Sequence, residues 1–112
     1  MALLKIKGQE VYIDDKCYPM VKLFNEKGLT TKYSCEGHNG NNFSIIFDQE
    51  VKDEQIEALL IKHLNKFNHS NLVGKFTKWC RPINGEIKYS WMYSAPTASF
   101  AERDYKVLTE EK

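Results

Sequence analysis

The sequence lacks several features that mark particular classes of protein. None of its apolar runs exceeds a few residues, so no segment of the 112-residue chain is long enough to cross a bilayer. It has three cysteines, an odd number without dense spacing, which excludes a disulfide-rich secreted scaffold. In residues 1–7 charged residues interrupt the apolar ones, so the segment does not contain the apolar core of a secretion signal. We therefore expect a reduced, cytoplasmic protein that does not contact a membrane.

Arginine is also scarce. Of the 16 basic residues only Arg81 and Arg103 are arginine, and the formal net charge is +1. Proteins that bind long duplexes usually carry a strong basic excess, and arginine is their usual reader of guanine edges and phosphates. The composition therefore argues against long duplex nucleic acid as a partner.

The rest of the composition is that of an ordinary globular protein. Hydrophobic residues make up 42% and charged residues 28% of the chain, which excludes wholesale disorder. A chain of this length buries about two thirds of its surface on folding, enough for one core. We expect residues 1–112 to form a single domain.

Hydrophobic periodicity and turn residues predict hairpins that alternate with helices. The expected strands are residues 3–7, 10–13, 29–35, 42–47, 75–81 and 86–94. The expected helices are about 15–27, 52–67 and 100–109. This order favours an α+β fold with a largely antiparallel sheet and two to three helices, in a ferredoxin-like (split βαβ) arrangement.

Local residues predict where these helices begin and end. Asp14 or Asp15 is expected to cap the first helix, and Gly28 to stop it in a left-handed conformation. Ser99 is the expected cap of the last helix. The second helix carries an apolar stripe that includes His63, and a lone histidine in such a stripe is more often a core residue than a ligand.

The segment from Ser34 to Asn39, which we call the strand-end turn, gathers more chemistry than any other. It follows a predicted strand and places Cys35, Glu36 and His38 within four positions. Gly37 between them is predicted to have a positive φ or to face a ligand closely. In a purely structural interpretation Cys35 is buried, Glu36 and His38 are solvated and Gly37 only makes a turn.

The residue types of this turn are compatible with two kinds of chemistry, metal binding and nucleophilic attack. Cys35 and His38 supply two zinc ligands at acceptable spacing, but Cys17, Cys80, His63 and His69 are scattered singly, so we expect no metal and no cofactor. Cys35 could act as a nucleophile only with a base or a positive field beside it, and no signature of a cysteine hydrolase is present. An inert thiol is the favoured interpretation.

The region of the turn resembles a known group of proteins. Small proteins of Firmicutes and their phages carry a pattern of the form N-x-x-G-x-x-T-x-x-S-C-x-G-H, followed by a Φ-x-Φ-x-F strand. The matching residues here, within about 17–50, are Asn25, Gly28, Thr31, Ser34, Cys35, Gly37, His38, Ile45 and Phe47. The resemblance implies a phage-borne protein whose site is this turn, with Thr31 included.

A more distant resemblance leads to the wybutosine-synthesising methyltransferases, which modify tRNA. Their S-S-C-S-G-R stretch is similar to the turn, but Tyr33, Glu36 and His38 stand where that family has Ser, Ser and Arg. This resemblance implies a connection with RNA.

Aromatic and basic residues concentrate in the second half of the chain. Ile87, Tyr89, Trp91 and Tyr93 share one face of a strand, with Trp79 as an expected cross-strand partner. Most of the row is expected in the core, with one or two members exposed as a stacking platform. Between Glu57 and Glu86 there are five basic residues and no acid.

Three functions fit these observations. The favoured one is a binding protein that captures an anionic, nucleotide-like small molecule, and a chain of this size often builds such a pocket as a homo-oligomer. The expected ligand-binding residues are Thr31, Ser34, Cys35, Gly37, His38, Asn39, Arg81, Trp91 and Arg103. The alternatives are a small enzyme acting on a nucleotide or RNA, with His38 as general acid-base assisted by Cys35 or Glu36, and an inhibitor that binds another protein.

Overall fold

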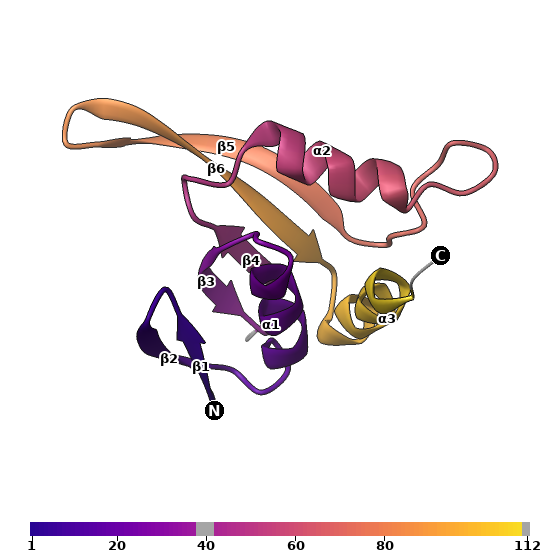
Figure 1. Cartoon of the computed structure of the whole chain (residues 1–112), viewed down its shortest axis with the longest axis horizontal. Coiled ribbons are helices and arrows are strands. Elements are labelled where there is room, and N and C mark those ends of the chain that lie inside the picture. Colours follow the sequence, from indigo (N-terminus) through magenta and orange to yellow (C-terminus); the bar gives the residue numbers. More distant parts are fainter. Residues whose placement is uncertain (38–41, 111–112) are drawn as a thin grey trace.

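The chain folds into three helices and two antiparallel sheets (Figure 1). The computed structural model describes residues 1–37 and 42–110. In order, the elements are β1 (Ala2–Ile6), β2 (Gln9–Ile13), α1 (Tyr18–Glu26), β3 (Thr31–Cys35), β4 (Phe43–Phe47), α2 (Asp53–Lys62), β5 (Lys75–Ile83), β6 (Glu86–Ala95) and α3 (Ala98–Thr109). The predicted α+β class is confirmed.

The larger sheet has the strand order β3-β4-β6-β5, and each neighbouring pair is antiparallel. Because β4 and β5 both run opposite to β6, they are parallel to each other, and α2 connects them. A helix that joins two parallel strands with a third strand between them is a split βαβ unit. The predicted topology is therefore present in strands β4 to β6.

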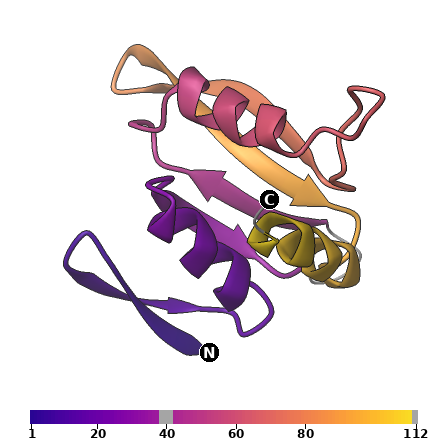
Figure 2. The same cartoon turned by 45° about the vertical axis from the view of Figure 1, so that its right-hand side comes forward.

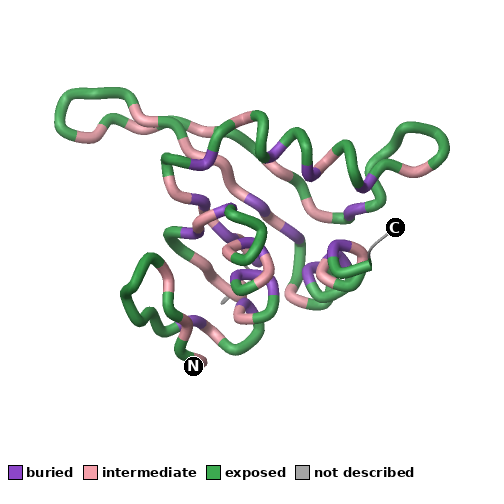
Figure 3. The backbone as a smooth tube through the Cα atoms, in the orientation of Figure 1, coloured by how far each residue is buried: buried purple, intermediate pink, exposed green. Residues whose placement is uncertain are grey.

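All three helices lie on one face of this sheet (Figure 2). Phe24 of α1 packs edge-on against Phe47 of β4, with ring centroids 5.0 Å apart, and also contacts Tyr93 of β6. Figure 3 shows the buried residues concentrated where α1 faces the sheet. We call this side of the sheet the helix face and the other side the open face.

A buried carboxylate fastens α3 to the helix face. Asp104 is fully buried, and its oxygens accept hydrogen bonds from the amides of Val73 and Gly74 and from the Tyr93 hydroxyl, each at 2.7 Å. Burial and this carboxylate together raise the pKa of Tyr93 well above its ordinary value. Three donors on one carboxylate fix α3 relative to β6 and to the segment before β5.

The two tight hairpins follow from asparagine, lysine and glycine in left-handed conformations. Asn84 and Gly85, between β5 and β6, have φ values of 53° and 79°. Lys7 and Gly8, between β1 and β2, have values of 51° and 79°, so this turn lies one residue earlier than predicted. Two-residue loops with both φ angles positive match the right-handed twist of a hairpin.

Both predicted helix N-caps are wrong, whereas the predicted glycine stop is confirmed. The carbonyl of Asp14 accepts the amides of Cys17 and Tyr18, so α1 begins at Tyr18 with Cys17, not an aspartate, at its N-cap. At the other end the expected stop at Gly28 is confirmed, with a φ of 83°. The cap of α3 is Thr97, whose hydroxyl accepts the amide of Phe100, and not Ser99.

The second helix is shorter than its apolar stripe predicted. It ends at Lys62, because the side chain of Asn65 accepts the amides of Phe67 and His69 and turns the chain. Phe67 is consequently 69% exposed, whereas His63 is buried at the end of α2, as expected for a core histidine. A local turn of this kind competes with the helix, so the hydrophobic periodicity alone predicted the wrong end of the helix.

Candidate functional site

The strand-end turn joins the edge strand β3 to β4. Gly37 has a φ of 90°, which confirms the predicted left-handed conformation. His38 and Asn39, the other expected site residues of the turn, lie outside the described residues. Ser34 pairs with Ile45 and therefore points to the helix face, whereas Cys35 pairs with Ser44 and points to the open face. The turn thus reaches both sides of the sheet.

On the helix face the turn meets the beginning of α1. Cys17 is completely buried, and this burial raises the pKa of its thiol to about 12, with the carboxylates of Asp14 and Glu36 acting in the same direction. A hydrogen bond with Ser34 works against the shift but does not cancel it. The Cys17 thiol therefore stays protonated at neutral pH and is unsuited to nucleophilic attack.

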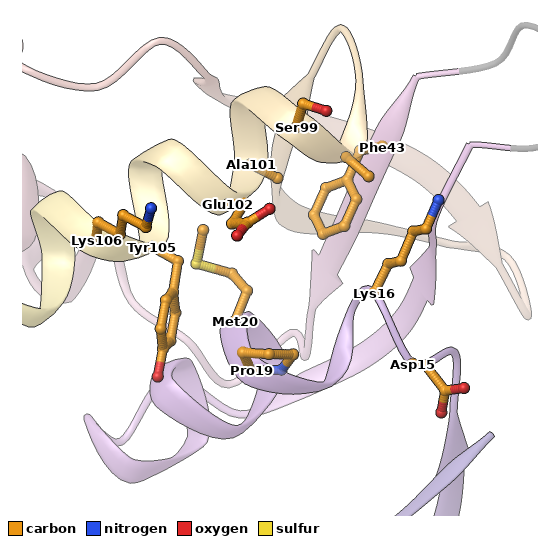
Figure 4. A pocket seen from close by; sticks show the side chains of 11 residues that line it. Asp15, Lys16, Pro19, Met20, Phe43, Ser99, Ala101, Glu102, Tyr105 and Lys106 are labelled. Carbon is orange, nitrogen blue, oxygen red and sulfur yellow. The ribbon is translucent and has the colours of Figure 1, made fainter.

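Next to this contact a pocket of about 510 Å³ lies between α1 and α3 (Figure 4). Its apolar residues come from the two helices and from the first residue of β4, and its charged residues lie around them. The lining residues are Asp15, Lys16, Pro19, Met20, Phe43, Ala98, Ser99, Ala101, Glu102, Tyr105 and Lys106. We call this cavity the α1–α3 pocket.

The α1–α3 pocket and the strand-end turn are neighbours. Phe43, which lines the pocket, is the first residue of β4, and Ser34 of the turn is hydrogen-bonded to Cys17, the residue after the pocket residue Lys16. Lys16 lines the pocket beside Cys17, and Figure 4 shows its side chain pointing toward the ends of β3 and β4. A molecule in the pocket would therefore have the turn at one rim.

The charged residues that line the pocket differ in whether they form ion pairs. Asp15 is paired with the N-terminal ammonium group at 3.3 Å. Within the described residues Lys16 and Lys106 form no ion pair, and Glu102 is the remaining carboxylate of the lining. Lys16 thus offers an ammonium group without an ion-pair partner among the described residues, while the carboxylates of Asp14 and Glu36 act on the adjacent Cys17.

Two of the expected site residues have structural roles elsewhere. Thr31 is buried at the opposite end of β3 from Cys35, where its hydroxyl accepts a hydrogen bond from the amide of Asn25 at 3.0 Å. The main-chain amide of Thr31 in turn donates to the side-chain Oδ1 of Asn25 at 3.3 Å. These bonds fasten the end of α1 to β3 and explain Asn25 and Thr31 without a ligand.

Trp91 is held by a carboxylate on the helix face. Its indole N–H donates to Asp53 at 2.9 Å, and the same carboxylate accepts a hydrogen bond from Lys78 at 2.9 Å. These bonds hold the pKa of Asp53 below its ordinary value, with Lys78 as the first cause. A second, more open cavity of about 330 Å³ lies around these three residues. Trp91 therefore anchors the start of α2 away from the strand-end turn.

The aromatic row of β6 runs from the core to solvent. Tyr93 is fully buried, Trp91 is partly buried, and Tyr89 and Ile87 are 55% and 56% exposed, as the expected mixture of core and rim requires. The predicted pairing of Trp79 with this row is wrong. Trp79 lies opposite Ser90 and therefore occupies the open face, one residue out of phase with the row.

Neither arginine lines the α1–α3 pocket. Arg81 belongs to β5, near the tip of the long hairpin, and its guanidinium lies 5.3 Å from the ring centre of Trp79. Arg103 is exposed on α3 and is absent from the pocket lining. Of the expected ligand-binding residues, the structure places Ser34, Cys35 and Gly37 at the turn and leaves Thr31, Trp91, Arg81 and Arg103 apart from it.

The pocket residues that the sequence analysis missed include Lys16, Phe43 and Tyr105. Met20 and Phe43 were recognisable only as apolar residues of a helix and a strand, and Tyr105 followed no motif. The missing information was the contact between α1 and α3, which brings segments some 80 residues apart in sequence together.

Metal coordination has no support among residues 1–37 and 42–110. No three or more of their His, Cys, Asp and Glu side chains gather closely enough to hold a metal ion. In the same part of the chain no helix is long and apolar enough to span a membrane.

Comparison with known proteins places the chain in a viral context. The model of a family described as YoqC prophage protein matches residues 6–112. No curated protein and no solved structure matches the chain. The match covers nearly the whole sequence, including the strand-end turn and both helices of the pocket.

Proposed function

This chain belongs to the YoqC prophage protein family, and from that premise we propose that it is a phage-borne binding protein that captures an anionic, nucleotide-like small molecule. The ligand occupies the α1–α3 pocket, with its anionic group at Lys16, beside the contact between Cys17 and Ser34 of the strand-end turn. The observation that carries the proposal is the pocket itself. Its volume of about 510 Å³ lies within the range of small-molecule sites, and its apolar centre has charged groups at the edge.

The lining matches the two halves of such a ligand. Phe43, Met20 and Tyr105 offer aromatic and thioether surface to a flat, weakly polar ring. Lys16, without an ion-pair partner among the described residues, offers a cation to a phosphate or carboxylate. Nucleotides share this combination, because each contains a flat ring and an anionic group that lie a few ångströms apart.

Capture is favoured over catalysis because the described lining contains no activated nucleophile. Cys17 is buried behind the turn, and its raised pKa keeps it protonated. Cys35 points to the open face, away from the pocket. An enzyme would have to rely on His38, so turnover that is lost on His38→Ala would support the alternative function.

Equilibrium dialysis against a panel of ribonucleoside mono-, di- and triphosphates tests the proposal. Lys16→Glu should weaken retention of the bound species by about tenfold or more, because it reverses the charge at the rim. Lys22→Glu is the matched control, since Lys22 is exposed on α1 and does not line the pocket. Retention should also fall as salt rises. Equal effects of the two substitutions would contradict the assignment of the pocket.

A further inference from the structure

None of the helices in the described part of the chain covers the open face of the four-stranded sheet. Cross-strand partners share a face, so the register assigns to it the residues that lie out of phase with Phe43, Ile45 and Tyr93. Its members are Tyr33, Cys35, Ser44, Ile46, Lys75, Thr77, Trp79, Arg81, Ile83, Glu86, Lys88, Ser90, Met92 and Ser94. None of them is buried, whereas the helix face contains the aromatic core.

Each aromatic ring of this face has a cation beside it. Tyr33 on β3 is 58% exposed, and the ammonium group of Lys32 lies 5.8 Å from its ring centre. Trp79 on β5 has the guanidinium of Arg81 at 5.3 Å. Trp79 is partly buried, and its indole nitrogen is itself buried without a hydrogen-bond partner among the described residues. Two separate rings thus offer a flat surface together with a positive charge.

The face is also positively charged, although the chain as a whole is nearly neutral at +1. Glu86 is the only carboxylate among the strand residues of this face, and it is paired with Lys88 at 2.7 Å. Lys32, Lys75 and Arg81 have no carboxylate partner among the described residues. The positive charge of the open face is therefore complementary to that of a polyanion.

We propose that the open face binds single-stranded nucleic acid. Bases stack on Tyr33 and Trp79, and Lys75, Arg81 and Lys32 contact the phosphates. Tyr33 and Trp79 lie on the two edge strands, which are about 14 Å apart across three strand spacings, and Trp79 is two residues beyond the position opposite Tyr33. A separation of about 16 Å between the two residues is one that a short extended single strand bridges. Stacking on exposed rings of a sheet needs unpaired bases, so a duplex is excluded as the ligand.

This inference is independent of the proposed small-molecule function. The α1–α3 pocket lies between helices that cover the helix face, so the two surfaces are on opposite sides of the sheet. Substitutions on the open face should leave retention in the pocket unchanged. The two proposals can therefore fail separately.

Fluorescence anisotropy with labelled 12-nucleotide oligo(U), oligo(dT) and a duplex of the same length tests the proposal. We expect the single strands to bind, the duplex to bind at least tenfold more weakly, and the affinity to fall steeply with NaCl concentration. The two single strands distinguish RNA from DNA as the source of the ligand. Absence of single-strand binding at low salt, or a duplex bound as tightly, would overturn the proposal.

Variants on the face locate the binding. Tyr33→Ala should weaken binding about fivefold or more through lost stacking. Tyr12→Ala is its control, because Tyr12 is 71% exposed on β2, outside the larger sheet. Thr77→Glu places a carboxylate at an exposed position of β5, between Lys75 and Trp79, and should weaken binding more than Thr77→Gln does.

A second copy of the chain is the competing occupant of this face. Sedimentation of the same protein as a function of concentration, with circular dichroism to verify the fold of each variant, decides between them. A dimer that Thr77→Glu disrupts would assign the face to self-association and overturn the proposal. A monomer whose single-strand binding is lost in Thr77→Glu and kept in Thr77→Gln supports it.

Discussion

At the residue scale, Gly74 leaves no room for a side chain. A Cβ atom added there would lie 2.5 Å from Cε1 of Tyr93, which is fully buried and hydrogen-bonded to Asp104. Gly74→Ala should therefore lower the free energy of unfolding by about 1–3 kcal/mol, measured by urea denaturation. Thr77→Ala, at an exposed position of the adjoining strand, should change it by less than about 0.5 kcal/mol. Equal stability of the two variants would contradict the predicted clash.

Thiol chemistry distinguishes the three cysteines at the same scale. Cys17 is buried with its pKa raised to about 12, Cys35 is half-buried and Cys80 is exposed. At pH 8 an alkylating reagent should therefore modify Cys80 rapidly and leave Cys17 unmodified until urea is added, as measured by mass spectrometry of peptides. Modification of Cys17 in the folded protein at the rate of Cys80 would contradict its burial.

The raised pKa of Cys17 also has a consequence for stability. The folded state holds the thiol proton more tightly than the unfolded state does. The contribution of the Cys17 thiol to the stability of the folded protein is therefore complete below pH 9 and is lost as pH rises toward about 12. Replacing Cys17 by Ala should remove this part of the alkaline decline in stability.

At the element scale, the start of α2 is attached to the long hairpin by Asp53. Its folded-state pKa lies below the ordinary value, so its contribution to stability is present above the unfolded pKa and is lost as pH falls through the folded one. Asp53→Asn should therefore lower the stability at pH 7 and flatten its decline in acid. Glu54→Gln, one residue further along the exposed start of α2, is the control and should do neither.

A carboxyl titration by NMR measures the cause directly. Lys78→Met removes the first contributor to the shift and should raise the pKa of Asp53 toward its ordinary value. If the titration of Asp53 is unchanged in Lys78→Met, Lys78 does not cause the lowered pKa of Asp53.

Most elements of the fold followed from local sequence. Alternating Phe43, Ile45 and Phe47 define β4, and Asn84-Gly85 defines the hairpin turn. The errors arose where one side chain altered the backbone. Asn65 ended α2 before its apolar stripe ended, and main-chain bonds from Asp14 moved the start of α1. Such competition between local turns and helices has no signature in hydrophobic periodicity.

At the scale of the whole molecule the candidate site was only partly predictable. The motif identified the strand-end turn, and Gly37 has the conformation expected of it. The α1–α3 pocket depends on the contact between α1 and α3, and the position of Trp79 on the open face depends on the register of β5 against β6. Long-range packing and register decide both, and neither is encoded in residues that are close in sequence.

Retention of a metabolite by the intact protein tests the central claim most directly. The purified protein is incubated with a nucleotide-containing metabolite extract, separated from free molecules and examined by native mass spectrometry. The account predicts one retained anionic species per site, released unchanged on heating and lost in Lys16→Glu but not in Lys22→Glu. Consumption of a species in excess over protein would contradict capture in favour of catalysis, and retention of nothing would contradict a small-molecule ligand altogether.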